Sequence, residues 1–252
     1  MGGFRGYLQH LGAVARLTVA TFFAFLRGPV EVRPFINQLD LAGIQSWSIT
    51  VLTAVFTGMV LALQFATGLE PYGASMYTGK LAALGIVREL GPMLTALLVG
   101  GRVGSGFAAE LGSMVVTEQV DAIRALGADP VKKLVAPRVL ACVIMLPLLT
   151  MLADVVGIVG SMIITVKEVG ITPKFFYAQI LDTLWVSDLM HGLMKSVAFG
   201  YIIGIVGCYV GLNTTGGTEG VGHSTTQAVV IGAIGLLVSN FFLTQLFLAV
   251  YG

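Results

Sequence analysis

Residues 41–69 read LAGIQSWSITVLTAVFTGMVLALQFATGL and contain no Asp, Glu, Lys or Arg. A helix that crosses a lipid bilayer needs about 20 consecutive, mostly apolar residues. This stretch is long enough, and its most apolar part predicts a first transmembrane helix over residues 47–66.

The composition of the whole chain agrees with this start. Of its 252 residues, 56% are hydrophobic and 11% are charged, with a mean hydropathy of +0.91. A soluble domain carries about 25% charged residues. The chain is therefore predicted to be an all-α, polytopic integral membrane protein. Its net charge of +1 provides no field for binding nucleic acid.

Four more apolar segments follow the first one. The second carries Arg88, Glu89, Arg102 and Glu110. The third begins with two lysines and is then interrupted only by Arg138 near its start and Asp154 in its middle, while the fourth and fifth are nearly uncharged. We predict one membrane domain over 1–252 with five spans, at residues 47–66, 83–113, 131–166, 193–212 and 227–251.

The segment before the first span has the pattern of an amphipathic helix over residues 4–27. At about 100° per residue, one narrow face carries Arg5, Gln9, Arg16 and Arg27, and aromatic side chains point the other way. This pattern predicts a helix that lies in the membrane interface. A solvated helix packed on a partner is the alternative.

Basic residues indicate the orientation of the spans. They cluster before the first span and between the second and third, at Arg5, Arg16, Arg27, Arg33, Arg124, Lys132, Lys133 and Arg138. Loops rich in Lys and Arg face the cytoplasm. The N-terminus is therefore expected in the cytoplasm and the C-terminus on the opposite side.

Two loops contain short helices of their own. Residues 117–126 predict a cytoplasmic helix that Thr117 caps and Gly127 ends. The apolar stripe of this helix consists of Val120, Ile123 and Leu126. On the other side, Thr172 is placed to cap a short amphipathic helix over residues 173–184.

Glycine spacing predicts where the spans approach closely. Small residues four apart occur at Gly100 and Gly104, Gly101 and Ser105, Gly200 and Gly204, and Gly207 and Gly211. Such pairs let helix backbones meet in lipid. The pattern does not distinguish contacts within one chain from contacts between two.

Ionisable groups inside a bilayer cost about 2.5–3.5 kcal/mol each at its centre and are functional candidates. Arg88 and Glu89 are adjacent and point about 100° apart, so each needs water, a headgroup or another helix. We expect a polar cavity near the outer end of the second span. A pair of interfacial charges that extend to water is the alternative.

Three other charges in the spans are predicted to be structural. Arg102 and Glu110 are expected to bridge to neighbouring spans. Asp154 is a lone acid in the third span, for which a buried hydrogen bond between helices is favoured over a proton relay.

No catalytic constellation is present in the sequence. It lacks G-x-x-x-x-G-K-[ST], so the chain is not itself a P-loop ATPase, and the three histidines are too dispersed for a metal site. Cys142 and Cys208 lie in apolar runs and are interpreted as small core residues. No cofactor or metal is expected in this chain.

Several motifs resemble the MlaE family of ABC-transporter permeases. They begin with Val87-Arg88-Glu89-Leu90-Gly91-Pro92 and Gly101-Arg102-Val103-Gly104-Ser105, followed by Ala109-Glu110-Leu111-Gly112. Thr117-Glu118-Gln119-Val120-Asp121-Ala122, Gly127-Ala128-Asp129-Pro130 and Pro137-Arg138 continue the similarity. The resemblance is specific over residues 57–149 and looser towards the C-terminus.

This resemblance implies a homodimeric permease in a bacterial inner membrane, since no transit peptide is visible. It implies cytoplasmic ATPase subunits that hold ATP and Mg²⁺, a small STAS-domain regulator on the ATPase, and a periplasmic ring of MCE-domain subunits. Its substrate would be phospholipid, moved between the inner and outer membranes to maintain outer-membrane lipid asymmetry.

The resemblance also assigns roles to residues of this chain. Residues 118–126 would form the coupling helix on the ATPase, through Glu118, Gln119, Asp121 and Arg124. Some family members carry a second Glu at the position of Gln119. Arg88 and Glu89 would line the lipid cavity at the dimer centre, and Tyr72 aligns with an aromatic residue of its lining.

The function expected from the sequence is that of a transporter subunit without a nucleotide site of its own. The alternatives are a secondary transporter driven by ion gradients, a membrane enzyme acting on lipid, and a scaffold that does not transport. The short helix over 117–126 argues against the secondary transporter, and the missing nucleophile–base pair argues against the enzyme.

Overall fold

The computed structural model describes residues 3–26 and 32–251 of the chain, the first 24 of them as one helix, α1 (Gly3–Leu26). The described part consists of helices and the turns between them, and five of its helical segments are long and apolar enough to cross a membrane. The predicted all-α membrane fold is confirmed. The five segments are Val32–Tyr72, Ser75–Val116, Val131–Val169, Val186–Leu212 and Gly217–Ala249.

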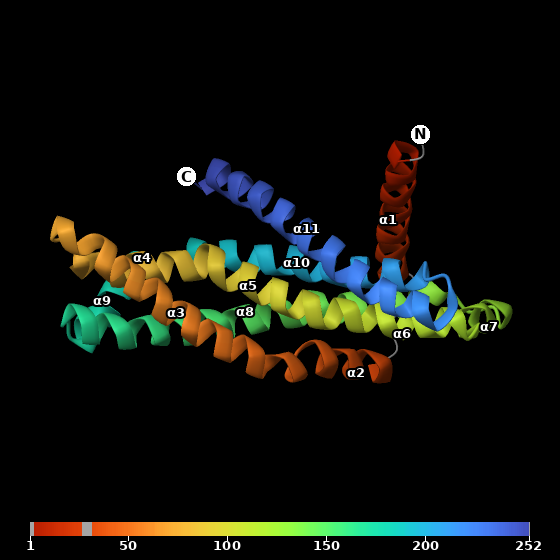
Figure 1. Ribbon diagram of the computed structural model, residues 1–252, viewed down its shortest axis with the longest axis horizontal. Helices are drawn as coiled ribbons and strands as arrows, with labels where there is room; N and C mark the ends of the chain where they lie inside the picture. Colours follow the sequence, from red (N-terminus) through yellow and green to blue (C-terminus); the bar gives the residue numbers. More distant parts are fainter. Residues whose placement is uncertain (1–2, 27–31, 252) are drawn as a thin grey trace.

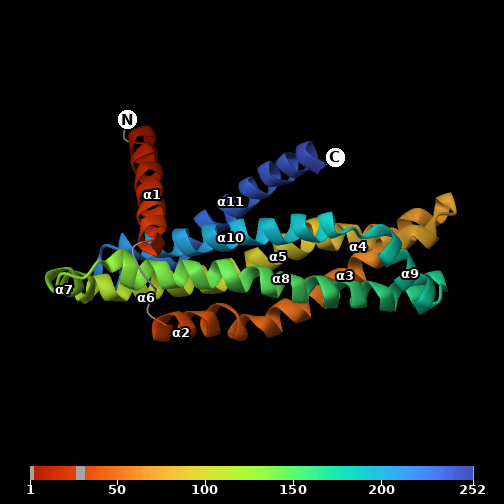
Figure 2. The same cartoon turned by 180° about the vertical axis from the view of Figure 1, so that it is seen from behind.

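The spans run along one long axis, so the bundle has two ends (Figure 1). One end carries the short helix α7 (Gln119–Ala125) and the other carries α9 (Pro173–Thr183). We call them the α7 end and the α9 end. Seen from behind, α8 (Ala136–Ile164) and α10 (Val186–Leu212) lie side by side along the bundle (Figure 2).

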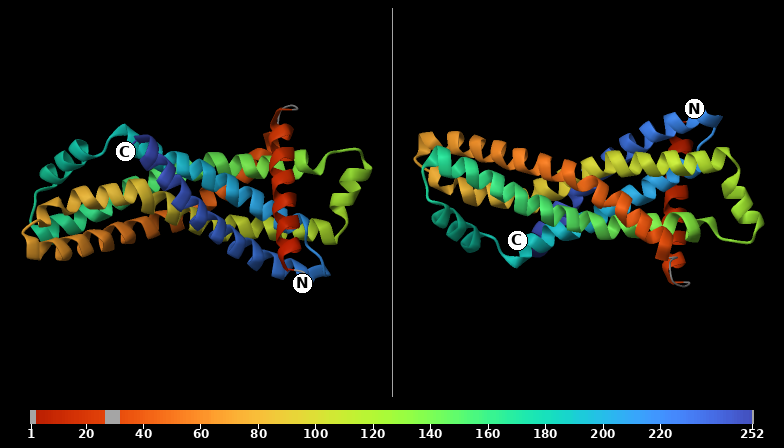
Figure 3. Two further views of the ribbon diagram at one scale, coloured as in Figure 1. Left: turned by 90° about the horizontal axis from the view of Figure 1, so that it is seen from above. Right: turned by 90° about the horizontal axis from the view of Figure 1, so that it is seen from below.

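Helix α1 crosses the long axis of the bundle at a steep angle in views from the side and from above (Figure 3). Val14 and Leu17 pack against the core, and the Tyr201 hydroxyl donates to the Thr18 carbonyl at 3.4 Å. Arg16 is exposed. The predicted polar face cannot be traced further, since Arg5, Gln9 and Arg27 lie outside the residues whose side chains are described.

A second helix precedes the first span, which the sequence analysis did not predict. Helix α2 (Val32–Ala42) leads through a short turn, η1 (Ile44–Ser46), into α3 (Trp47–Leu69). Pro34 and the polar Asn37, Gln38 and Asp40 obscure it in the sequence. Its contacts with α8 hold it along the bundle at the α7 end.

The second span is one continuous rod with two wider π-helical turns. It runs through α4 (Thr78–Gly85), η4 (Ile86–Leu90), α5 (Gly91–Val99), η5 (Gly100–Gly104) and α6 (Ser105–Val116). At the first π turn the Gly91 amide bonds the carbonyl of Ile86, five residues earlier. Such turns often mark functional sites in helices.

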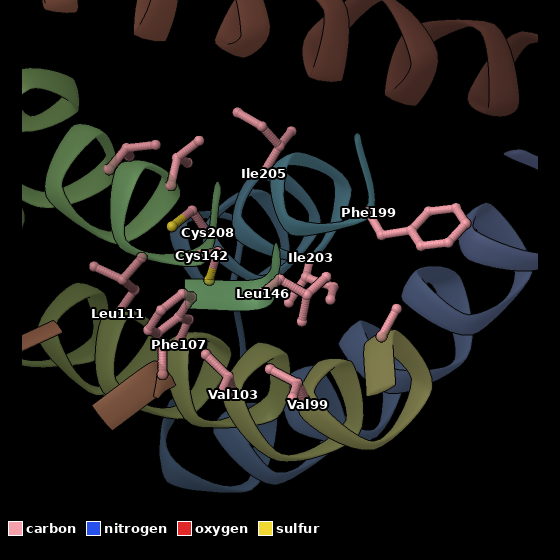
Figure 4. Packing of buried hydrophobic residues seen from close by; sticks show 14 of the residues in the cluster. Val99, Val103, Phe107, Leu111, Cys142, Leu146, Phe199, Ile203, Ile205 and Cys208 are labelled. Carbon is pink, nitrogen blue, oxygen red and sulfur yellow. The ribbon is translucent and has the colours of Figure 1, made fainter. Parts of the chain in front are cut away.

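Apolar side chains of the second, third and fourth spans fill the core in the half of the bundle towards α7 (Figure 4). Val103, Phe107 and Leu111 of the second span face Cys142 of α8 and Cys208 of α10. Both cysteines are fully buried and free, as expected of core residues.

The glycines of α10 pack within this chain. A Cβ on Gly200 would lie 2.5 Å from the Cys142 carbonyl of α8, and one on Gly207 would lie 2.8 Å from the Gly104 carbonyl. Gly204 and Gly211 likewise face α8 and α6. These pairs therefore join spans of one subunit, whereas Gly101 faces open space.

The fourth and fifth spans begin earlier than the sequence predicted. Helix α10 starts at Val186, because Asp188 accepts a hydrogen bond from the Trp185 amide at 2.9 Å and caps the helix. Lys195, near the start of the predicted span over 193–212, therefore lies more than two turns inside the helix.

Helix α11 (Gly217–Tyr251) includes the glycine-rich segment that the sequence assigned to a loop. The turn that precedes it uses positive φ at Gly216 and Gly217. The Thr214 hydroxyl then bonds the Ser224 hydroxyl at 2.8 Å and ties the first turns of α11 to the end of α10. This contact between distant polar residues is not visible in the local pattern.

Of the three predicted ends of the two short helices, one is wrong and two are correct. Thr117 does not cap α7: its hydroxyl bonds the Ser113 carbonyl, and Glu118 occupies the cap position with φ of 58°. Gly127 does end the helix, with φ of 77°. Thr172 caps α9 by accepting from the Phe175 amide at 3.3 Å, as predicted.

Candidate functional site

A charged cavity lies towards the α9 end, between the second, fourth and fifth spans. It has a volume of about 290 Å³ and is lined by Leu84, Gly85, Arg88, Glu89, His191, Lys195, Thr244, Phe247 and Leu248. The π-helical turn η4 carries Arg88 and Glu89 into this region. The predicted polar cavity near these two residues is therefore present within a single chain.

Arg88 is held by an acid of the fourth span. Its Nε donates to Asp188 Oδ1 at 2.6 Å, and its Nη2 also contacts that oxygen. The side chain of Asp188 is 1% exposed and that of Arg88 is 42% exposed. The acid is thus fixed in the protein, while the guanidinium keeps an open side.

Glu89 is held by a buried lysine. Lys195 Nζ donates to Glu89 Oε1 at 2.6 Å, and the Asn240 amide of α11 donates to Oε2 at 3.2 Å. Here too the partner is buried, since the Lys195 side chain is 2% exposed against 38% for Glu89. Both ion pairs thus place one member against the cavity and the other in the protein interior.

Lys195 uses its three ammonium protons within the protein. Besides Glu89 it donates to Thr244 Oγ1 at 2.8 Å and to the Arg88 carbonyl at 3.1 Å. That carbonyl would normally accept from the residue four positions later, which is Pro92 and has no amide proton. Lys195 therefore satisfies a backbone acceptor that the proline leaves open.

The remaining wall of the cavity is aromatic. The rings of His191 and Phe247 are stacked, with centroids 4.9 Å apart and an interplanar angle of 17°. A site with two cations, two anions and apolar walls is neutral overall. It can offer a guanidinium to an anion and a carboxylate to a cation, with apolar surface beside both.

The partners of Arg88 and Glu89 in this site were not predicted from the sequence. Asp188, Lys195, Asn240 and Thr244 all come from later spans, and their contacts with Arg88 and Glu89 link positions 100 to 155 residues apart. One signal in the sequence could have found them: inside a membrane Arg88 needs an acidic partner and Glu89 needs a basic one. Asp188 and Lys195 in the fourth segment would have met that need.

Tyr72 is not brought to these residues within one chain. It lies in η2 (Glu70–Tyr72) just after α3, is 81% exposed, and does not line the cavity. Its expected place in a lipid pocket stays a prediction.

The other intramembrane charges connect helices. Arg102 Nη1 donates to the Leu41 carbonyl at 3.1 Å and to Ser46 Oγ at 2.8 Å, which ties the second span to the start of the first. Glu110 of α6 pairs with Arg138 of α8 at 2.8 Å.

Asp154 does not form the hydrogen bond that the sequence analysis favoured. Its side chain is buried, and neither carboxylate oxygen has a partner among the described residues. The oxygen Oδ1 lies directly over Gly91, where an added Cβ would collide with it. The facing helix therefore presents a bare glycine and offers the acid no side-chain donor.

Helix α7 presents charges at the opposite end of the bundle. Val120 is buried, and Ile123 packs on the core. Asp121 and Arg124 pair at 2.9 Å on the exposed face, where Leu126 is 86% exposed. The four residues expected to contact an ATPase are all exposed, namely Glu118, Gln119, Asp121 and Arg124.

Comparison with known proteins agrees with this arrangement. The family model "Permease MlaE" matches residues 35–246. A "Probable ABC transporter permease protein" of Synechocystis is 44% identical over 95% of this chain and 91% of its own length. One of Rickettsia felis is 38% identical over 97% and 94%.

A plant protein is also similar. The chloroplastic protein TRIGALACTOSYLDIACYLGLYCEROL 1 of Arabidopsis thaliana is 39% identical over 88% of this chain and 63% of its own length. The match to the family model and the identity to bacterial permeases over nearly the whole chain lead to one assignment. The chain belongs to the MlaE family and is an ABC transporter permease.

Proposed function

We propose that this permease moves phospholipid between the inner and outer membranes of a bacterium, driven by ATP hydrolysis in a partner chain, and so helps maintain outer-membrane lipid asymmetry. The observation that carries the proposal is the cavity at the α9 end, where Arg88 and Glu89 are half exposed against apolar walls. The name of the plant relative contains a glycerolipid, which fits a lipid substrate.

The cavity suits an amphiphile with a phosphate. Arg88 can donate to phosphate oxygens by charge-assisted bonds through its open side, while Asp188 holds it in place. Leu84, Phe247 and Leu248 offer apolar surface for acyl chains. Glu89 can attract an ammonium headgroup or repel a phosphate during release.

ATP and Mg²⁺ would be bound by the ATPase subunits, and α7 would be the coupling helix on them. Val120 anchors α7 to the bundle, so a push on α7 is passed to α6 as rigid-body motion. Glu118, Gln119, Asp121, Arg124 and the exposed Leu126 would form the contact. The α7 end is then cytoplasmic, α1 lies in the inner-membrane interface, and the C-terminus is periplasmic.

The permease would act as a homodimer with α11 at its interface. Only 6% of the most apolar stretch of α11 is buried within the chain, against 56% for α10. Its exposed side chains include Ile234, Phe241 and Phe242, and the helix diverges from the bundle towards its C-terminus (Figure 1). Two such helices facing each other would enclose the cavities of both subunits.

Other partners would bind at the two ends. At the α9 end, an MCE-domain ring would dock near α9, where Phe175, Tyr177 and Leu181 are exposed. Phe176 is buried and packs on Gly79, which fixes α9 to α4. A STAS-domain regulator would bind the ATPase and not this chain.

Phospholipid that copurifies with the chain in mild detergent tests the proposal. Arg88→Gln removes the cavity cation and should lower bound phospholipid by about tenfold, the effect of about 1.4 kcal/mol. Lys80→Gln is the matched control, since Lys80 pairs with the exposed Asp182 outside the cavity. Equal lipid content in both variants would contradict the proposed cavity function.

A further inference from the structure

Arg102 differs from several other cations inside the spans. Three of these pair with a carboxylate, as Arg88–Asp188, Lys195–Glu89 and Arg138–Glu110. Among the described residues, Arg102 contacts neutral oxygens only. Within the part of the chain that the structure describes, this positive charge in a membrane span therefore has no carboxylate partner, although such charges normally pair.

The unused donors of Arg102 form a pair. Both protons of Nη1 are used, by the Leu41 carbonyl and by Ser46 Oγ, and one of Nη2 is used by Gln45 Oε1 at 2.8 Å. A guanidinium has five N–H donors. The Nε proton and the second Nη2 proton have no acceptor among the described residues, and a guanidinium can use donors on these two nitrogens to bind a phosphate.

Arg102 lines an open groove between the second and fifth spans. The groove has a volume of about 420 Å³. One wall is Arg102, Ser105, Gly106 and Ala109, and the other is Thr225, Thr226, Val229 and Val230. Hydroxyls and a cation beside small and branched apolar residues suit a polar headgroup followed by the start of its acyl chains.

The depth of Arg102 in the bundle matches that of α1. Gly100 and Gly104 on either side of Arg102 pack on Ile203, and Tyr201, two positions from Ile203, contacts the Thr18 carbonyl of α1. Ser46, an acceptor of Arg102, immediately precedes α3. If α1 lies in the membrane interface, as proposed above, Arg102 lies at the level of the headgroups.

We propose that this groove binds the phosphate of a phospholipid headgroup from the leaflet at the α7 end. Arg102 supplies the bidentate donors and the missing counter-charge is the phosphate. The residues are separate from those of the cavity at the α9 end, so one chain would hold a lipid at each membrane surface. The site rests on the interfacial placement of α1 but not on transport through the other cavity.

Photo-labelling of the full chain tests the site. The chain is placed in phosphatidylcholine vesicles with a minor fraction of phosphatidylglycerol that carries a diazirine next to its glycerol. We expect labelling of residues 225–230, which falls by about tenfold in Arg102→Gln as one bidentate phosphate contact is lost. Arg102 also holds α2 on the bundle, so Arg102→Gln could disturb the fold. A second variant therefore blocks the groove and leaves Arg102 unchanged.

Gly106→Leu is that variant. A Cβ added at Gly106 meets no atom of the chain within 4 Å, and Gly106 lines the groove. The leucine side chain should therefore extend into the groove with little effect on the packing of the spans. Gly106→Leu should reduce the labelling as strongly as Arg102→Gln does. Gly68→Leu is the control, since Gly68 also faces open space, and it should not reduce the labelling. Labelling of the cavity at the α9 end should stay unchanged in all three, which separates this site from the proposed transport cavity.

Three results would overturn the proposal. Unchanged labelling in Arg102→Gln and Gly106→Leu would show that neither the charge nor the groove holds lipid. Loss of labelling on adding inorganic phosphate would identify a site for a free anion. Disulfide cross-linking of Ser105→Cys to Thr225→Cys of a second copy, with no lipid label, would show that another subunit fills the groove.

Discussion

At the α9 end the second, fourth and fifth spans meet through two ion pairs around a cavity of about 290 Å³, whereas at the α7 end they meet through close glycine contacts and a continuous apolar core. The charged contacts are half open and can be exchanged for contacts with a ligand. The apolar contacts are buried and cannot be exchanged without leaving voids.

This difference suggests that the two halves of the molecule move differently during transport. A tightly packed half transmits the motion of α7 without deforming, because close-packed interiors have low compressibility. A half that is held by charges can separate when a headgroup replaces one partner of each pair. We therefore expect conformational change at the α9 end and rigid-body movement at the α7 end.

The largest effect is expected from breaking the charged half. Lys195→Met leaves Glu89 without its cation and the Arg88 carbonyl without its donor. The free energy of unfolding in detergent should fall by about 2–3 kcal/mol, less than the ~3–5 kcal/mol of a fully buried pair because Glu89 is 38% exposed.

Lys80→Met is the control for that experiment. Lys80 pairs with Asp182, whose side chain is 76% exposed, so its removal should cost at most about 1 kcal/mol. Equal losses in the two variants would mean that the buried network contributes no more than a surface ion pair. Adding Glu89→Gln to Lys195→Met should restore part of the loss.

The next effect concerns the apolar half. Gly207→Ala would place a methyl group 2.8 Å from the Gly104 carbonyl and push α10 away from the second span. Such overpacking costs about 1–3 kcal/mol. Gly106→Ala, which faces open space, should instead gain about 0.5–1 kcal/mol in helix propensity. Chemical unfolding measures the unfolding free energy of both variants. A Gly207→Ala variant as stable as wild type would contradict the close contact between Gly207 and Gly104.

Asp154, which faces Gly91 next to the charged half, tests whether a buried acid without a described partner lowers stability. Its carboxylate is buried and has no partner among the described residues. Asp154→Ala should therefore leave stability unchanged or raise the unfolding free energy by about 1 kcal/mol, the opposite sign to Lys195→Met. If the unfolding free energy of Asp154→Ala instead falls, the carboxylate has a stabilising partner. A transport defect in a stable variant would indicate a functional role.

The smallest effect on stability is expected at α7. Asp121→Asn breaks an ion pair in which both side chains are more than 60% exposed, so unfolding should change by less than about 0.5 kcal/mol. Leu126→Ser, at 86% exposure, should be equally mild. Binding of an ATPase, measured by copurification, should nevertheless fall in both. A loss of fold in either would mean that α7 stabilises the bundle and is not mainly a docking element.

The sequence was sufficient to predict the number of spans, because a mostly apolar run of about 20 residues matches the thickness of a bilayer. The end of α7 and the start of α9 were also predictable, since Gly127 and Thr172 act on their immediate neighbours, whereas α2 was not predicted. By contrast, the start of α11 depends on a bond between Thr214 and Ser224, and local composition favoured a loop there.

The candidate site was predictable in part for a similar reason. Arg88 and Glu89 stood out as charges in an apolar span, but their partners depend on how distant helices face each other. Lys195 is 106 positions from Glu89 along the chain. The hydrogen bond predicted for Asp154 is absent among the described residues for the same reason, because its partner also depends on how distant helices face each other. The residue that faces Asp154 is Gly91, which has no side chain to donate.

The most direct test of the account is isolation of this chain from its native membrane in mild detergent, with mass spectrometry of the bound proteins and lipids, for wild type and Leu126→Ser in parallel. We predict that wild type brings down an ATPase, an MCE-domain protein and phospholipid, and that the variant keeps the lipid but loses the ATPase. Recovery of the wild-type chain alone, with neither ATPase nor phospholipid, would contradict the proposed transport function.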